Sequence, residues 1–216
     1  MASKLCKDIE VSTSKQNTPP RPRGRPRGFN RDQALAEALR LFWQRGYEGA
    51  SIAELTTAMG ITPRALYDAF ESKEALYREA LESYKAGPGN FTTRALQEEL
   101  TAYAAVARIL REAATAFSSA DDPTGCMIST AVLACAPEHD PIAATVASMR
   151  AATIQALADK IAHGKKKGEL PSDVNAQELA RFYGAVIQGM SVQARDGADR
   201  ARLLAIAERS LKAWPR

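Results

Sequence analysis

Residues 25–73 read RPRGFNRDQALAEALRLFWQRGYEGASIAELTTAMGITPRALYDAFESK and carry the clearest structural signals in the chain. Apolar residues repeat at helical spacing after a capping Asn30, which predicts a first helix. Two shorter helices follow, with capping residues at Ser51 and Thr62. Gly60 lies between them and allows the positive φ that a tight turn often needs. The segment therefore predicts a helix-turn-helix, whose second helix enters the major groove of DNA.

A fourth helix is expected after Ser72, another capping residue. Lys73 lies in its first turn, where the helix dipole disfavours a cation by a few tenths of a kcal/mol or more. A phosphate at this helix end would reverse that effect, because the N–H groups and the lysine would bind one anion together. The alternative is a solvated lysine offset by Glu74. The position directly after a helix-turn-helix favours the phosphate.

The positive charge of the chain is concentrated at its start. Residues 1–30 hold seven Lys/Arg and two Asp/Glu, a net charge of +5, and the other residues sum to −1 because the whole chain carries +4. Residues 1–28 are poor in apolar residues, which predicts a basic arm that is disordered when free. We expect its arginines to contact the minor groove or phosphates: Arg23, Arg25 and Arg27. A solubilising charge run is the alternative.

Other classes of function find little support in the sequence. The longest apolar run, residues 128–136, is too short to span a bilayer, and the start of the chain has no hydrophobic signal segment. This predicts a soluble cytoplasmic protein without a membrane partner. The cysteines and histidines lack the spacing of a disulfide framework or a metal site: Cys6, Cys126, Cys135, His139 and His163. We therefore expect no metal, no cofactor and no enzymatic activity.

The segment GRPRGF followed by ALRLFWQRGYEGASIAELTTAMGITPRALYDAFESKEALY resembles the N-terminal domain of the tetracycline-repressor (TetR) family of transcriptional regulators. Many positions agree in spacing across about 50 residues. The landmarks are Ala38, Leu41, Phe42, Gly46, Tyr47, Ser51, Ile52, Ala53, Gly60, Leu66, Tyr67, Phe70, Lys73, Leu76 and Tyr77. The resemblance covers about the first third of the chain after the arm, and the later helices fit the family by architecture.

The resemblance implies roles for individual residues. It identifies Thr62 to Ala69 as the recognition helix. Three side chains match family positions that touch phosphates: Ser51, Tyr67 and Lys73. Three match positions that face the major groove: Thr62, Arg64 and Ala65.

Arg64 departs from the family pattern, which has a small residue or Gly at this position. An arginine at a helix tip can bind guanine O6 and N7 with two hydrogen bonds. It can also bind a phosphate, which would carry no sequence information. We favour the base contact slightly.

The rest of the chain predicts further helices. A Gly/Pro break follows Tyr84, a short and nearly wholly apolar helix is expected from Cys126 to Ala136, and a long helix is expected to end near Gly164. Two C-terminal helices follow. The expected fold is all-α: the arm, a three-helix helix-turn-helix DNA-binding domain over residues 29–85, and a larger helical effector-binding and dimerisation domain over residues 86–216.

The resemblance also implies a homodimer through the last two helices and a ligand pocket in the second domain. Candidate interface residues are Phe182, Val186, Met190, Leu204 and Leu211. Candidate pocket residues are Tyr103, Phe117, Met127, Met149 and Tyr183. For both sets the alternative is the ordinary core of one chain. The apolar and aromatic content of the pocket candidates suggests an uncharged or hydrophobic effector.

The expected function is that of a ligand-responsive transcriptional regulator, a repressor that binds a palindromic operator in double-stranded DNA as a dimer. An unknown small-molecule effector would release it. Three alternatives stay open. They are an activator, a thiol- or redox-responsive regulator that uses Cys126 or Cys135, and an architectural protein that binds A·T-rich DNA without an effector.

Overall fold

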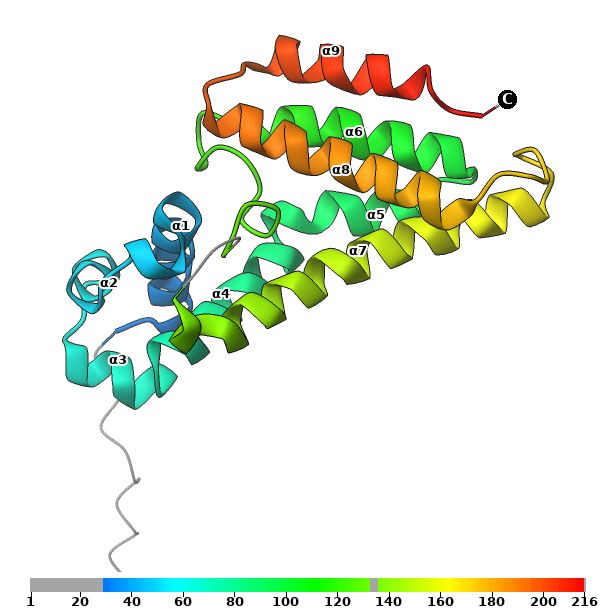
Figure 1. The fold of residues 1–216 in the computed structure, drawn as a ribbon. Coiled ribbons are helices and arrows are strands. Elements are labelled where there is room, and N and C mark those ends of the chain that lie inside the picture. Colours follow the sequence, from blue (N-terminus) through cyan, green and yellow to red (C-terminus); the bar gives the residue numbers. More distant parts are fainter. Residues whose placement is uncertain (1–28, 133–135, 216) are drawn as a thin grey trace, which may run out of the picture.

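The computed structural model describes residues 29–132 and 136–215, and every regular element within these ranges is helical (Figure 1). The all-α fold is therefore confirmed. The arm arginines Arg23, Arg25 and Arg27, together with Cys6 and Cys135, lie outside the described residues. The described helices all fall short, in length or in apolar content, of what crossing a membrane requires.

The N-terminal helices begin at the capping residues that the sequence predicted. They are α1 (Arg31–Gly49), α2 (Ile52–Met59), α3 (Pro63–Phe70) and α4 (Lys73–Ala86). The Asn30 side chain accepts the N–H groups of Asp32 and Gln33 at the start of α1. The Ser72 hydroxyl accepts the N–H of Ala75 at the start of α4. These bonds satisfy N–H groups that have no partner within the helix.

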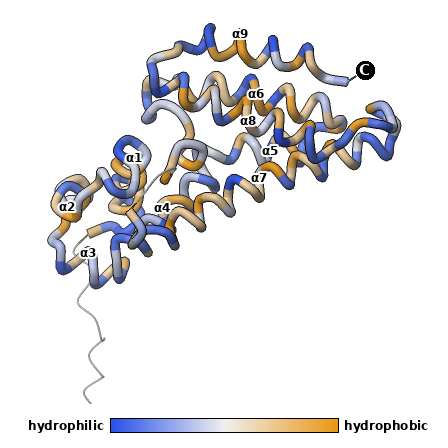
Figure 2. Tube along the Cα trace, viewed as in Figure 1, coloured by the Kyte–Doolittle hydropathy of each residue, from blue (hydrophilic) through white to orange (hydrophobic). Residues whose placement is uncertain are grey.

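The four helices bury one apolar cluster. Its fully buried members include Phe42, Leu55, Leu66 and Phe70. Aromatic rings pack against one another in its centre, and the Phe42 and Tyr77 rings meet edge to face at 4.9 Å between centroids. Figure 2 shows hydrophobic positions interleaved with hydrophilic ones along these helices, as expected for helices that bury one face.

Tyr77→Phe is expected to raise the free energy of unfolding by about 1 kcal/mol. Tyr77 is fully buried, and its hydroxyl has no hydrogen-bond partner among the described residues. Burial also raises the pKa of this phenol. A buried hydroxyl without a partner costs free energy that phenylalanine avoids. Urea unfolding of both proteins measures the change, and a variant less stable than the parent would show that the hydroxyl has a stabilising partner.

The remaining helices form a second bundle. They are η1 (Pro88–Asn90), α5 (Phe91–Glu98), α6 (Ala102–Phe117), η2 (Pro137–His139), α7 (Asp140–Lys166), α8 (Ala176–Arg195) and α9 (Arg200–Leu211). In Figure 1, α6, α8 and α9 lie together at one end of the molecule, and α7 runs from α3 and α4 to the far end. Ile142 and Val146 of α7 pack into the N-terminal cluster, whereas Leu157 and Ile161 pack into the second.

The prediction of a short helix from Cys126 to Ala136 is wrong. Residues 126–132 form turns, and the backbone of Val132 has φ 45°. The reason lies in the partners of the backbone groups. The Cys126 N–H donates to the Ser191 hydroxyl of α8, and Arg150 of α7 donates to the carbonyls of Ile128 and Ala131. These bonds to neighbouring helices satisfy backbone groups of the segment outside a helical ladder.

Candidate nucleic-acid interface and effector cavity

Local hydrogen bonds set the turn between α2 and α3. The Ser51 hydroxyl accepts the Glu54 N–H, and the Glu54 carboxylate accepts the Ser51 backbone N–H, so the two residues form a capping box. Gly60 has φ 64°, as the tight turn requires. The Thr62 hydroxyl accepts the Ala65 N–H, and Pro63 occupies the first position of α3. The first turn of the recognition helix is therefore held by its own side chains.

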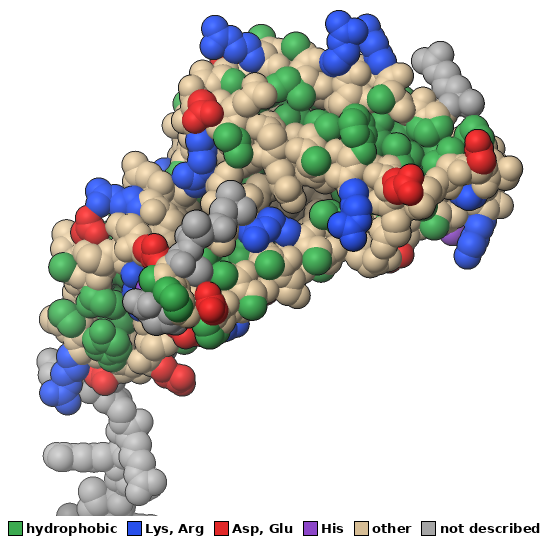
Figure 3. All heavy atoms as spheres, viewed as in Figure 1, with side chains coloured by type: hydrophobic (Ala, Val, Ile, Leu, Met, Phe, Trp, Pro, Cys, Tyr) green, Lys and Arg blue, Asp and Glu red, His purple; other side chains and the backbone are tan. Residues whose placement is uncertain are grey.

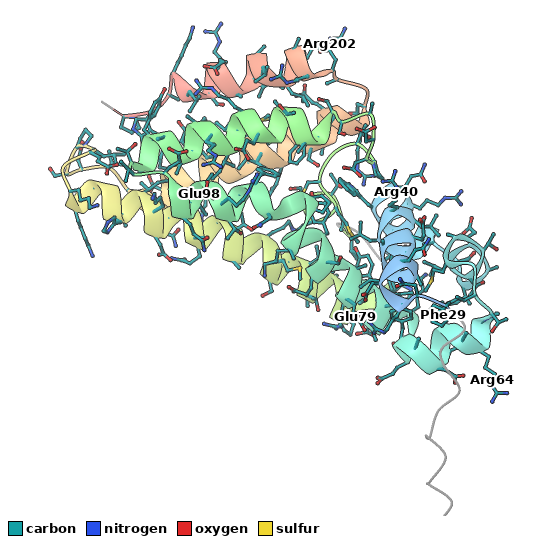
Figure 4. The ribbon with its side chains drawn as sticks, turned by 180° about the vertical axis from the view of Figure 1, so that it is seen from behind. Phe29, Arg40, Arg64, Glu79, Glu98 and Arg202 are labelled. Atoms are coloured by element: carbon teal, nitrogen blue, oxygen red, sulfur yellow. The ribbon has the colours of Figure 1, made fainter. Side chains whose placement is uncertain are left out.

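The outward face of α3 carries polar side chains that are free to meet a partner. Arg64 is 92% exposed and lies 3.8 Å from Asp68, a weak surface pair. Tyr67 is 48% exposed. Figure 4 shows the Arg64 side chain pointing away from the body of the protein. On the other face of the helix, Leu66 and Phe70 are buried in the N-terminal cluster.

The other two major-groove candidates lie on either side of Arg64. Thr62 is exposed, although its hydroxyl is already used in the cap. Ala65 is half-buried and lines an open hollow with Phe29, Gly60 and Ile61. Phe29, the first described residue, lies beside the predicted recognition helix (Figure 4).

Lys73 is packed and not freely solvated. Its ammonium lies 4.5 Å from the centroid of the Tyr47 ring. Burial lowers its pKa, and the charges of Glu48 and Glu54 oppose this shift. Glu74, which sequence reasoning offered as the neutralising neighbour, instead accepts two hydrogen bonds from Arg78. The phosphate contact of Lys73 stays a prediction.

A cavity of about 370 Å³ lies within the second bundle. Its wall comes from the end of α4, from η1, α5, the end of α6, α7 and α8, and from residues 126–129. Two predicted pocket residues, Phe117 and Met149, line it. The others lie elsewhere: Tyr103 is 44% exposed against Trp214, Met127 is buried in the N-terminal cluster, and Tyr183 is buried in the second.

Several lining residues were not anticipated from the sequence. They include Phe91, Leu96, Arg150, Ile154 and Ile187. Apolar residues at helical spacing, such as Ile154 and Ile187, indicate burial but cannot distinguish a cavity wall from a filled core, and the spacing gives no signal for Arg150. Cys126 also lines the cavity, so the thiol-responsive alternative stays a prediction. Within the described ranges, no group of three or more His, Cys, Asp and Glu side chains is arranged to hold a metal.

The predicted dimer residues divide into two sets. Met190 and Leu211 are buried inside the chain's own core, so they cannot form a surface. Phe182 is 43% exposed, and Val186 and Leu204 are half-buried. Figure 3 shows hydrophobic side chains gathered over the α8 and α9 face. An exposed apolar stripe runs along α8 at helical spacing: Phe182, Ala185, Gly189 and Val192.

Comparisons with known proteins cover most of the chain. Residues 34–80 match the family described as bacterial regulatory proteins, tetR family, and residues 102–209 match the tetracyclin repressor-like C-terminal domain. The HTH-type transcriptional repressor ComR of Escherichia coli (strain K12) is 36% identical over 89% of this chain and 92% of its own length. BdcR, another HTH-type transcriptional repressor of that strain, is 32% identical over 90% of this chain and 92% of its own length.

A solved structure agrees with the fold. It is a cysteine mutant of the TetR family transcriptional regulator CifR, complexed with 26-bp double-strand operator DNA, and it superposes with a TM-score of 0.86 at 44% identity over 89% of this chain and 100% of that chain. The exposed recognition helix and these similarities over both halves of the chain lead to one conclusion. The chain belongs to the tetR family of bacterial regulatory proteins.

Proposed function

We propose that two copies of this chain bind a palindromic operator and repress transcription until a small molecule in the cavity releases them. Membership of the family makes the chain a DNA-binding transcriptional regulator and not an enzyme. The observation that carries the proposal is the recognition helix α3, which exposes Arg64 and Tyr67. The operator complex of CifR, a protein 44% identical to this chain, supports the same mode of binding.

The proposed dimer follows from the exposed stripe on α8. When a second copy covers an apolar row on a helix surface, the row leaves water, and this burial stabilises the dimer. Small residues in the row, Ala185 and Gly189, would allow two helices to approach closely, and the space beside the Gly189 Cα is open. A two-fold dimer presents two recognition helices to two half-sites of a palindrome. The stripe is therefore the proposed centre of the interface.

The proposed effector site is the cavity of the second bundle, and α4 links it to the DNA end. Tyr84 and Lys85 near the end of α4 line the cavity, whereas Lys73 begins the same helix beside α3. A ligand that shifts the cavity end of a stiff 14-residue helix would move its other end. The coupling is reciprocal: the factor by which the effector weakens operator binding is also the factor by which the operator weakens effector binding.

A DNA partner also implies a cytoplasmic site of action in a bacterium.

Arg64 tests how the operator is read. Once selection from a random DNA pool has identified the operator, Arg64→Ala is expected to weaken operator binding by about 5- to 150-fold, because a bidentate contact to guanine contributes about 1–3 kcal/mol of discrimination. Binding to a scrambled duplex should change much less. Fluorescence anisotropy at one fixed salt concentration measures both affinities.

Arg64→Lys is the matched variant, because it keeps the charge and loses the planar fork. A base reader should lose part of its specificity in this variant, because an ammonium lacks the rigid fork that fits guanine O6 and N7, whereas a phosphate contact should survive it. An equal loss of affinity for every DNA sequence in Arg64→Ala would contradict the role of base reader and make Arg64 a backbone anchor.

A further inference from the structure

The charges around the cavity are all of one sign. Its lining includes two cations, Lys85 and Arg150, and neither an aspartate nor a glutamate. Lys85 is largely exposed and lies 3.7 Å from Glu82, so its charge is partly compensated at the surface. Arg150 is half-buried in the wall formed by α7. The uncompensated charge of the cavity therefore belongs chiefly to Arg150.

The partners of Arg150 are neutral. One guanidinium nitrogen donates to the carbonyls of Ile128 and Ala131, at 3.2 and 3.0 Å. No carboxylate among the described side chains lies within ion-pair distance of it, whereas Arg31 and Arg111 each bind a glutamate. A guanidinium carries five N–H donors, and its fork can bind a carboxylate or another oxyanion with two parallel charge-assisted hydrogen bonds. Arg150 therefore has unused capacity for an anion, and the cavity is the space from which an anion can reach it.

The remainder of the lining is mainly apolar. Six side chains from four helices form this part of the wall: Phe91, Leu96, Phe117, Met149, Ile154 and Ile187. Such a surface favours a ligand with an aromatic or aliphatic part, because moving that part out of water is favourable. A small inorganic anion could use Arg150 but would leave this surface uncovered.

We infer that the effector is an amphipathic organic anion, with a carboxylate or sulfonate that binds the Arg150 guanidinium and an apolar body that fills the cavity. This inference rests on the proposed function of the cavity as the effector site. It differs from the sequence expectation of an uncharged effector, because Arg150 did not stand out among the cations of α7 until the fold placed it in the wall.

Two fluorescent probes that differ only in charge test the inference. One is 1-anilinonaphthalene-8-sulfonate, and the other is N-phenyl-1-naphthylamine, which has the same rings without the sulfonate. The full-length protein should bind the sulfonate more tightly. Arg150→Gln should weaken the sulfonate by about tenfold or more, since hydrogen bonds to charged groups are strong, and should leave the neutral probe within about twofold.

Three further variants control the measurement. Lys167→Gln makes the same change in net charge at an exposed turn and should leave both probes unchanged. Arg150→Lys should recover part of the sulfonate affinity. Ile187→Trp reduces the cavity and should weaken both probes, which shows that they bind there. Equal affinities of the two probes for the parent protein, or equal losses in Arg150→Gln, would overturn the inference.

A separate measurement of operator binding distinguishes failure of the proposed repressor function from failure of the inference about the effector. A protein that binds its operator but shows no Arg150-dependent preference for the sulfonate remains a repressor with an effector of another class, and the inference fails. A protein that prefers the sulfonate through Arg150 but binds no operator refutes the proposed function and leaves the charge preference of the cavity supported.

Discussion

Ala185→Glu is expected to convert the dimer to a monomer and to weaken operator binding by about a hundredfold or more. Ala185 lies at the centre of the exposed apolar stripe of α8, between Phe182 and Gly189. Because the stripe is the proposed centre of a two-fold interface, Ala185 of both copies would lie close to the axis, and the substitution would bring two carboxylates together without counter-ions. Burying them costs more free energy than a small apolar contact supplies.

The loss of operator affinity follows from the loss of the second head. In a dimer, binding of one recognition helix holds the other near its half-site at a high effective concentration, and a monomer lacks this gain. Sedimentation equilibrium measures the mass, and anisotropy with the operator measures the affinity. Ala151→Glu on α7, an exposed alanine outside the stripe, is the control and should change neither. If Ala185→Glu remained a dimer, the α8 stripe would not be the dimer interface.

Gly125→Ala is expected to lower the free energy of unfolding by about 2 to 4 kcal/mol. Gly125 has φ 77°, a region that residues with a Cβ rarely adopt. A Cβ at this position would also lie 2.8 Å from the Ser191 carbonyl oxygen of α8, too close for any carbon. Because the obstructing atom belongs to the backbone of a helix, it cannot move away cheaply. Backbone strain and overpacking therefore add together.

The effect of Gly125→Ala should extend to the contact between the two bundles. The Trp43 indole of α1 donates to the Gly125 carbonyl, and Arg195 of α8 donates to the Trp43 carbonyl. Displacing Gly125 weakens the only hydrogen bond that the buried indole makes among the described residues. We therefore expect a fall in Tm together with a change in tryptophan fluorescence.

Gly168→Ala separates the two causes. Gly168 has a similar φ of 80°, but nothing lies within 4 Å of the position that a Cβ would take. This variant carries the backbone strain alone, about 1 kcal/mol. Urea unfolding of the parent protein, Gly125→Ala and Gly168→Ala gives the loss of unfolding free energy in each variant. If the two variants lost the same stability, the close approach of Gly125 to α8 would have no energetic consequence.

Local sequence was sufficient wherever a structure depends on neighbouring residues. The caps at Asn30, Ser51, Thr62 and Ser72 all lie where the chain predicted them, because each bonds N–H groups only two or three residues away. The exposure of Arg64 follows similarly from the spacing of Leu66 and Phe70, which turns one face of α3 inward. The helix-turn-helix was therefore predictable in detail.

The segment after Cys126 shows where local patterns fail. Its apolar composition predicted a buried helix, yet its backbone groups bind Ser191 and Arg150, which lie far away in the sequence. Hydrophobic spacing reports that a residue is buried but not which partner buries it. For the same reason Met190 and Leu211 could not be distinguished from interface residues, nor Tyr183 from a pocket residue.

By itself, then, the sequence determined the four N-terminal helices, their caps and the family, since these depend on contacts within one turn or on a motif of contiguous residues. Only the tertiary structure decided which apolar residues fill the core, which line the cavity, and which remain exposed on α8. It also decided that Arg150 lines the cavity and that its partners among the described residues are carbonyl groups. These properties depend on how helices distant in the chain pack against one another, and a periodic pattern along one helix does not specify its neighbours.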